Sequence, residues 1–125
     1  MEEKDFDLGQ AGEEEAARYL NGLGLDILER NFRLPFGELD IIARHKDTLV
    51  FVEVRTKTTA EHGHPLETIT SGKKHKIVKT AMGYLKKTGQ YDTLARFDVV
   101  ALIPLAQGGW EIEHIPNAFE VEQFS

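Results

Sequence analysis

Two apolar runs joined by a short polar turn stand in the middle of the sequence, GELDIIARHKDTLVFVEVRTK at residues 37–57. This pattern predicts a hairpin with strands at about 38–44 and 48–56. The second run, LVFVEV, is almost continuously apolar and rich in valine, which is typical of a central strand covered on both faces. We therefore expect a sheet built around this hairpin, with other elements packed on its two sides.

Helical and strand patterns flank the hairpin. Apolar residues at helical spacing predict one helix over roughly 8–23, capped by Asp7, and another over roughly 72–88, capped by Ser71. Further strands are predicted in LDILERNFRL, RFDVVALI and WEIEHI. The predicted fold class is α/β, with a mixed sheet of about five strands flanked by helices in the order α-β-β-β-α-β-β.

Length and composition favour a single domain. With 125 residues and 41% hydrophobic content, the chain can bury one core, so one domain over 1–125 is expected, with flexible ends at 1–7 and 120–125. There is no apolar run near the length of a membrane span and no apolar leader, so we expect a cytoplasmic protein with no membrane partner. The absence of cysteine excludes disulfides and thiolate zinc sites.

The charge of the chain is unevenly distributed. The formal net charge is -6, yet the segment 68–91 contains six lysines and no acidic residue. Such a segment is either a solvated helix face or a surface that binds phosphate. Its first three lysines, Lys73, Lys74 and Lys76, lie in the first turns of the second predicted helix.

Two acidic residues, Asp40 and Glu53, interrupt the apolar runs of the hairpin. With a two-residue turn at 46–47, antiparallel pairing places them directly opposite each other, on one side of the sheet and about 5 Å apart at Cβ. Like charges in this position repel, so a compensating cation is expected. It is either a basic side chain or a divalent ion such as Mg²⁺, which prefers carboxylate oxygens.

Other charged residues are predicted near the pair. In the same register Glu38 faces Arg55, and Lys57 lies one alternation further along the same side. Glu13 lies on the core-facing side of the first helix and is a third candidate carboxylate. Its alternative role is to complement the helix dipole and reach water.

Five stretches together resemble a known family: GEEEAARYL, ERNFR, the hairpin itself, KKHKIVKTAMGYL and RFDVVAL. Over residues 8–119 the chain resembles the YraN-like family of bacterial predicted endonucleases. That family belongs to the PD-(D/E)xK nuclease superfamily, close to archaeal Holliday-junction resolvases. The resemblance implies a restriction-endonuclease-like core in which the hairpin presents a metal site.

The resemblance also implies residue roles. Asp40, Glu53 and Glu13 match the metal-binding acids, and Glu38 matches a group behind them. The third signature position is Arg55, where the superfamily has lysine. Arginine can stabilise charge on a phosphate but stays protonated and cannot serve as a base.

The expected function is hydrolysis of branched or flapped DNA by an endonuclease that depends on Mg²⁺ or Mn²⁺. The residues expected to carry it are Asp40, Glu53, Arg55 and Lys57 in catalysis, and Lys73, Lys74 and Lys76 on the DNA backbone. Related resolvases are symmetric dimers, which suits a homodimer here. Two alternatives stay open: a nucleic-acid-binding module that does not cleave, which Arg55 favours, and a protein–protein adaptor with solvated carboxylates.

The histidines add little to this picture. His62 and His64 are expected to form an exposed pair in the loop before the second helix, and His75 and His114 have no partner at ligand spacing.

Overall fold

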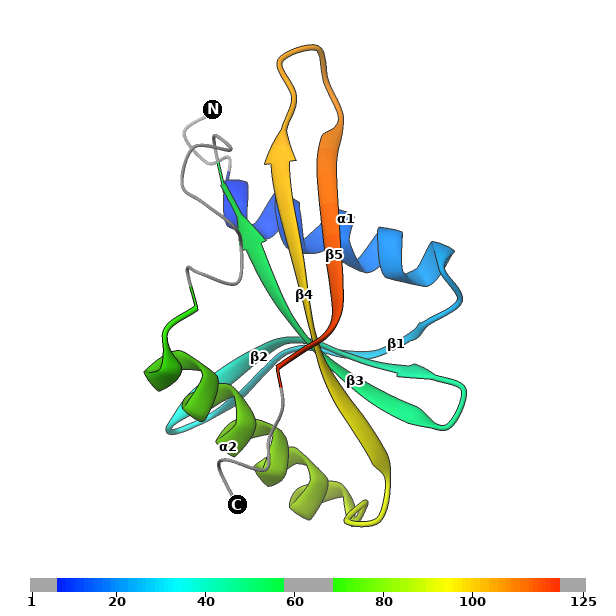
Figure 1. The fold of residues 1–125 in the computed structure, drawn as a ribbon, viewed down its shortest axis with the longest axis vertical. Helices are drawn as coiled ribbons and strands as arrows, with labels where there is room; N and C mark the ends of the chain where they lie inside the picture. The colour runs from blue at the N-terminus through cyan, green and yellow to red at the C-terminus, as the bar shows by residue number, and fades with distance from the viewer. Residues whose placement is uncertain (1–6, 58–68, 120–125) are drawn as a thin grey trace.

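The apolar hairpin forms the middle of a five-stranded sheet. A computed structural model describes residues 7–57 and 69–119 of the chain. In chain order the elements are α1 (Leu8–Gly22), β1 (Asp26–Leu34), β2 (Gly37–His45), β3 (Thr48–Thr56), α2 (Ser71–Thr88), β4 (Leu94–Pro104) and β5 (Trp110–Phe119) (Figure 1). The strands lie in the order β1-β2-β3-β4-β5, so the predicted fold class and element order are confirmed.

The β2–β3 hairpin has the register predicted from a two-residue turn. Its pairs run from His45 opposite Thr48 to Ile41 opposite Val52. Within the turn Lys46 has a φ of 58°, a left-handed conformation that few residues other than glycine adopt. The register brings positions 40 and 53 opposite each other at the open end of the hairpin.

The sheet is mixed because β3 and β4 run parallel. A parallel pair requires a long crossover connection, and α2 lies within it. The other neighbouring strands pair in antiparallel fashion, which leaves β1 and β5 at the two edges. The central position of β3 agrees with the almost continuously apolar LVFVEV run.

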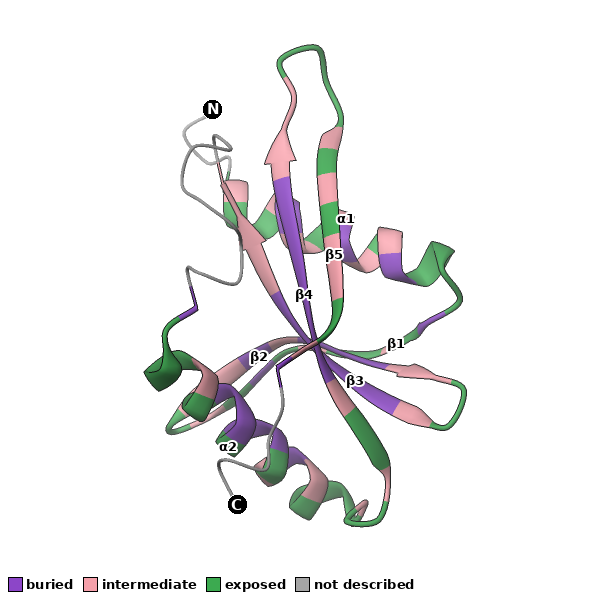
Figure 2. Cartoon of the chain, viewed as in Figure 1, coloured by how far each residue is buried: buried purple, intermediate pink, exposed green. Residues whose placement is uncertain are grey.

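Each helix covers one face of the sheet (Figure 1). Ala16 and Leu20 of α1 belong to the buried cluster on one face, and Ile77 and Ala81 of α2 belong to the cluster on the other. The buried segments in Figure 2 accordingly run through the middle strands and along one stripe of each helix. Within 7–57 and 69–119, no helix is long and apolar enough to cross a membrane.

The helix caps follow the sequence with one correction. Asp7 caps α1 by accepting a hydrogen bond from the backbone N–H of Gln10 at 3.2 Å. The predicted cap of the second helix was wrong, because Thr70 and not Ser71 accepts the bond from the Lys73 N–H, at 3.1 Å. Both hydroxyl side chains are good caps, so the sequence does not distinguish two neighbouring candidates. Apart from Asp7, the predicted flexible ends lie outside the described residues.

A buried polar network joins β4 to β5. Asp98 is fully buried and accepts bonds from Arg96 at 3.0 and 3.2 Å and from the backbone N–H of Asn117 at 2.9 Å, and it lies 2.8 Å from His114 Nε2. Burial alone would raise the pKa of Asp98, but the bonds to His114, Arg96 and Asn117 outweigh it and lower the pKa. The hydrogen-bond partner of His114 was not predicted, since Asp98 is distant from it in the sequence.

Two glycines let the helices approach the open end of the hairpin. A Cβ atom at Gly12 in α1 would overlap the side chain of Thr56 at the end of β3. A Cβ atom at Gly37, where β2 begins, would overlap the side chain of Thr80 in α2. Both helices are therefore packed against this end of the hairpin at a distance that only glycine allows.

We expect Gly12→Ala to destabilise the protein by about 1–3 kcal/mol, because the added methyl group overpacks the contact with Thr56. Gly22→Ala in the same helix is the matched control. No atom lies within 4 Å of its added Cβ, so the change should be neutral or slightly stabilising. Urea denaturation measures both, and an equal effect at the two positions would contradict the close approach of α1 to β3.

Candidate active site

Asp40 and Glu53 come together where β2 and β3 separate. The last registered pair is Ile41 with Val52, and the two acids are the next residues on each strand. The Asp40 carboxylate reaches across to β3, where its Oδ2 accepts a hydrogen bond from the Val54 N–H at 2.8 Å. The Asp40 carboxyl group also lies close enough to Glu53 for the charge of Glu53 to raise the pKa of Asp40.

Glu53 of the acidic pair is buried and Asp40 is half-buried, and the two carboxyl groups repel each other when both are ionised. Burial, followed by the nearby charge of Glu53, raises the pKa of Asp40 to about 8. Glu53 is only 6% exposed, so water screens the pair poorly. The Asp40 carboxyl group therefore keeps its proton near neutral pH, because its ionisation beside Glu53 is unfavourable.

Two basic side chains approach Glu53 from different elements. Lys73 Nζ, from the first turn of α2, lies 3.3 Å from Glu53 Oε2, and Arg55 Nη1 lies 3.5 Å from the same oxygen. Lys73 is fixed at its backbone by the Thr70 cap. Glu53 Oε2 is thus contacted by one basic side chain from β3 and by another from α2.

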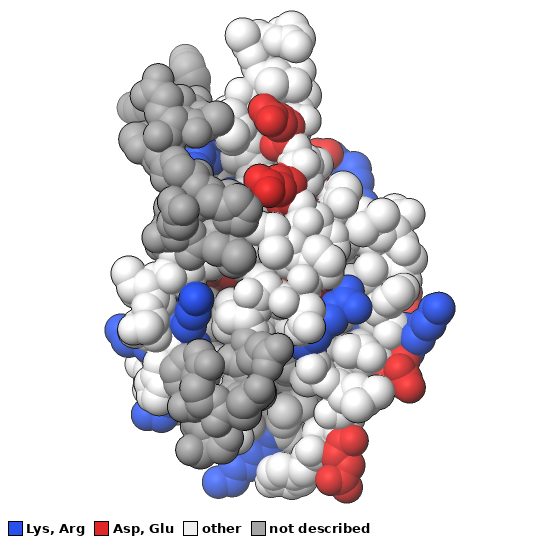
Figure 3. Space-filling model, in the orientation of Figure 1, with Lys and Arg blue, Asp and Glu red and all other residues white. Residues whose placement is uncertain are grey.

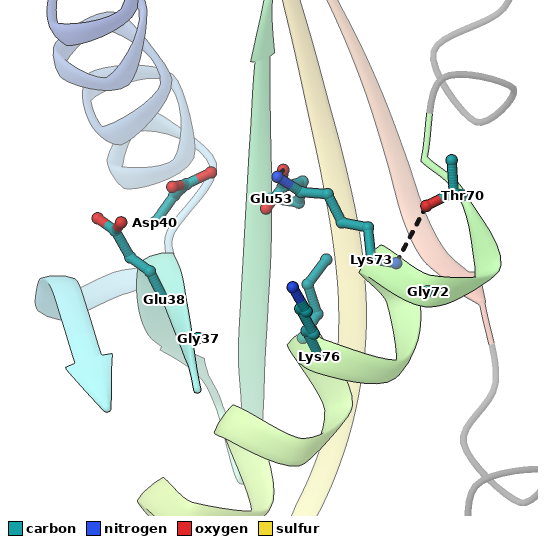
Figure 4. A pocket seen from close by; sticks show the side chains of 9 residues that line it. Gly37, Glu38, Asp40, Glu53, Thr70, Gly72, Lys73 and Lys76 are labelled. Atoms are coloured by element: carbon teal, nitrogen blue, oxygen red, sulfur yellow. Dashed lines mark hydrogen bonds and ion pairs between the residues drawn. The ribbon is translucent and has the colours of Figure 1, made fainter. Parts of the chain in front are cut away.

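The pair lies between two hollows on the surface. One cavity, of about 420 Å³, is lined by Gly37, Glu38, Asp40, Glu53, Thr70, Gly72, Lys73, Lys76 and Ile77 (Figure 4). The other, of about 330 Å³, is lined by Gly9, Glu13, Asp40, Glu53, Val54, Arg55, Thr56, Lys57 and Lys73. Asp40, Glu53 and Lys73 line both, so a phosphate and an ion could reach the carboxylates from either side.

Glu13 and Glu38 lie beside the pair and share a partner that the sequence reasoning missed. The side-chain amide nitrogen of Asn31 lies 3.1 Å from Glu13 Oε1 and 3.1 Å from Glu38 Oε2. Asn31 has a φ of 55°, a left-handed conformation that asparagine tolerates better than most residues. Its place in the ERNFR stretch was visible, but nothing local in the sequence indicates which acids it would meet.

The pKa of Glu13 is subject to opposing effects from its surroundings. Burial raises the pKa of Glu13, the positive charge of Arg30 lowers it, and the charges of Glu38 and Glu53 raise it, with a net increase. Glu38 forms an ion pair with Arg33 across the β1–β2 ladder, at 3.4 Å, and its registered neighbour is Arg33 and not Arg55. The predicted pairing of Glu38 with Arg55 lies beyond the β2–β3 ladder, which ends at Ile41, and it stays a prediction.

The predicted metal site is only partly assembled. Among the described residues, no group of three or more histidine, aspartate or glutamate side chains is arranged to hold a metal ion. The Asp40–Glu53 pair nevertheless suits Mg²⁺ or Mn²⁺, since a hard cation can bind one or two carboxylates and keep its remaining positions for water and phosphate. The raised pKa of Asp40 marks the place where such a cation would relieve the repulsion.

The three lysines predicted to bind a nucleic-acid backbone separate in space. Lys73 and Lys76 line the larger cavity, whereas Lys74 Nζ lies 5.7 Å from the ring centre of Phe119. Lys57 lines the smaller cavity. In Figure 3 basic and acidic side chains are interspersed over the visible surface, so this view shows no continuous basic face. His62 and His64 lie outside the described residues.

Fold and site together define a small α/β domain that places an acidic pair at the open end of its central hairpin. Residues 12–102 match the model of the family described as "Uncharacterised protein family UPF0102", and the chain belongs to this family. UPF0102 proteins of Geobacter sulfurreducens and Syntrophotalea carbinolica are 48% and 44% identical over 114 and 115 residues, covering 91% and 92% of this chain and 89% and 93% of the relatives. This family is the YraN family, so the resemblance seen in the sequence is confirmed.

We expect Asp40→Asn to change how stability depends on pH. Asp40 ionises near pH 4 in the unfolded chain but near pH 8 in the folded protein, so the folded state binds more protons in between. The free energy of unfolding of the wild type should fall as pH rises from about 4 to 8, and the variant should lack this decline.

Urea denaturation in EDTA at pH 5, 7 and 9 measures the difference, with the variant more stable than the wild type at pH 9. Asp47→Asn, in the exposed turn of the same hairpin, is the matched control and should follow the wild-type profile. Parallel pH profiles of the free energy of unfolding for wild type and Asp40→Asn would contradict the raised pKa of Asp40 in the folded protein.

Proposed function

We propose that this protein is a metal-dependent endonuclease that hydrolyses phosphodiester bonds in branched or flapped DNA. The observation that carries the proposal is the half-buried Asp40 beside the buried Glu53, where Asp40 keeps its proton at a pH at which isolated carboxylates are ionised. Perturbed acids in a cleft are typical of functional sites. Membership of the YraN family adds the expected reaction class, through the nuclease superfamily that its motifs resemble.

Each residue has a defined part in this proposal. Asp40 and Glu53 would hold Mg²⁺ or Mn²⁺, and Glu13 would orient the site from α1. The metal supplies an activated water at neutral pH and neutralises charge on the phosphate. Arg55 and Lys57, which line the smaller cavity, would contact the phosphate from the strand side.

The DNA backbone would be held chiefly by the lysines that face the larger cavity. Lys73 and Lys76 line it, and contacts from lysine to phosphate need charge but carry little sequence information. Lys74 was predicted as a third contact, but it is directed toward Phe119, so we assign it a smaller share. Recognition of DNA shape and not of base sequence follows from this arrangement.

One observation favours a second candidate, a module that binds structured DNA without cutting it. Arg55 occupies the signature lysine position and forms an ion pair with Glu53 at 3.5 Å. A permanently charged guanidinium cannot take a proton from water. If no other group compensates for the missing lysine, the site would bind phosphate and leave it intact.

We expect Mg²⁺ to raise the melting temperature of the wild type at pH 8 and to support cleavage of branched DNA. A ligand that binds only the folded state stabilises it according to its concentration and affinity. Glu53→Gln should lose both effects, because it removes one of the two carboxylates. Glu111→Gln, an exposed acid on β5, is the matched control and should retain both.

Thermal denaturation with and without Mg²⁺, together with a gel assay on a four-way junction, a flap and a linear duplex, tests the proposal. Cleavage that persists in Glu53→Gln would indicate a contaminating nuclease and reject the assigned site. Stabilisation by Mg²⁺ and tight junction binding without cleavage would support the binding module.

A further inference from the structure

We propose that Lys73 supplies the ammonium group that the motif strand lacks, so that helix α2 and not strand β3 brings the catalytic lysine to the reacting phosphate. This inference rests on the proposed nuclease function. It gives Lys73 a role different from that of a general backbone contact. Its basis is the position of Lys73 relative to Glu53, the acid of the signature motif.

The first observation is contact. Lys73 Nζ lies 3.3 Å from Glu53 Oε2, slightly closer than Arg55 Nη1 at 3.5 Å. Figure 4 shows the Lys73 side chain extending from α2 toward Glu53 across the cavity. The two residues are 20 positions apart in the sequence, so this contact exists only because α2 folds back over the sheet.

The second observation is access. Among the basic residues of the site, Lys73 lines both cavities, whereas Lys76 lines only the larger and Arg55 and Lys57 only the smaller. A phosphate entering either cavity would therefore meet the Lys73 ammonium beside the acidic pair. The side chain is 47% exposed, so it can adjust to a ligand without disturbing the core.

The third observation is that the backbone of Lys73 is held in a fixed position. The Lys73 N–H donates to the Thr70 cap, which fixes its position in the first turn of α2. Gly37 allows α2 to pack closely against the start of β2 at Thr80, two turns further along the helix. The backbone of Lys73 is thus held in place, while the exposed end of its side chain lies beside Glu53 and the reacting groups.

An ammonium group fits the task of donating to several acceptors around one point. It is compact and has three N–H donors, so one can remain on Glu53 while the others reach the attacking water and a non-bridging phosphate oxygen. Lys73 acts with its charge unchanged. In the step itself, the water oxygen forms a bond to phosphorus and the P–O bond to the departing strand end breaks with its electron pair on oxygen. The attacking water releases its proton to solvent, and the departing oxygen takes one from solvent.

The absence of cysteine from the chain allows a selective chemical test. In Lys73→Cys the new thiol is the only one, and 2-bromoethylamine converts it into an aminoethyl side chain that closely mimics lysine. Iodoacetamide converts the same thiol into a neutral side chain. Lys79→Cys, treated identically, is the matched control from the same helix, since Lys79 is exposed and lines neither of the two cavities.

We measure single-turnover cleavage of a saturating four-way junction in Mg²⁺, and junction affinity by fluorescence anisotropy in Ca²⁺. The neutral form of Lys73→Cys should cut at least about 100-fold more slowly, as when one preorganised donor is lost, while its affinity changes less than about threefold. The aminoethyl form should recover most of the rate. The neutral form of Lys79→Cys should bind the junction and cut it as the wild type does.

Cleavage at the wild-type rate by neutral Lys73→Cys, or no recovery after aminoethylation, would overturn the role of Lys73 while leaving the nuclease function intact. A loss of rate that saturating DNA fully restores would also overturn it, since Lys73 would then be only a backbone contact. If the wild type shows no cleavage that Glu53→Gln abolishes, both the nuclease function and this inference fail.

Discussion

The structure depends on one electrostatic constraint, the enforced contact of two acidic side chains where the central hairpin opens. The pairing of β2 with β3 places Asp40 and Glu53 on the same face of the sheet. Burial removes water that would otherwise screen their charges. The raised pKa of Asp40 results from this repulsion, and the positive charges of Lys73 and Arg55 beside Glu53 reduce it. Proteins retain such unfavourable arrangements mainly where function requires them, and the packing of the surrounding sheet offsets the cost.

Much of the fold was predictable because it follows from local patterns. Alternation and the continuous LVFVEV run indicated the hairpin, its register and its central place, and helical spacing indicated both helices. The contact of Asp40 with Glu53 followed directly from that register. The partners of Glu38, His114 and Asn31 did not, because they come from strands whose pairing no local pattern determines.

The same distinction explains which parts of the site were misjudged. Lys73 was predicted from charge alone, as one of three similar lysines, yet the helix rotates Lys74 toward Phe119 and Lys73 toward Glu53. Composition cannot separate neighbours on a helix whose docking angle is unknown. That angle depends on close backbone contacts such as the one at Gly37, where a glycine in the sequence is equally consistent with an ordinary turn.

The parallel pairing of β3 with β4 also has a kinetic consequence. The acidic pair belongs to a short hairpin, a type of element that closes within microseconds, whereas α2 and its lysine are positioned only once a long crossover connection has closed. Arg55 lies on the same hairpin as the acidic pair, so Lys73 is the basic partner that joins late. A change that loosens the crossover therefore removes Lys73 from the acidic pair first and leaves Arg55 beside Glu53.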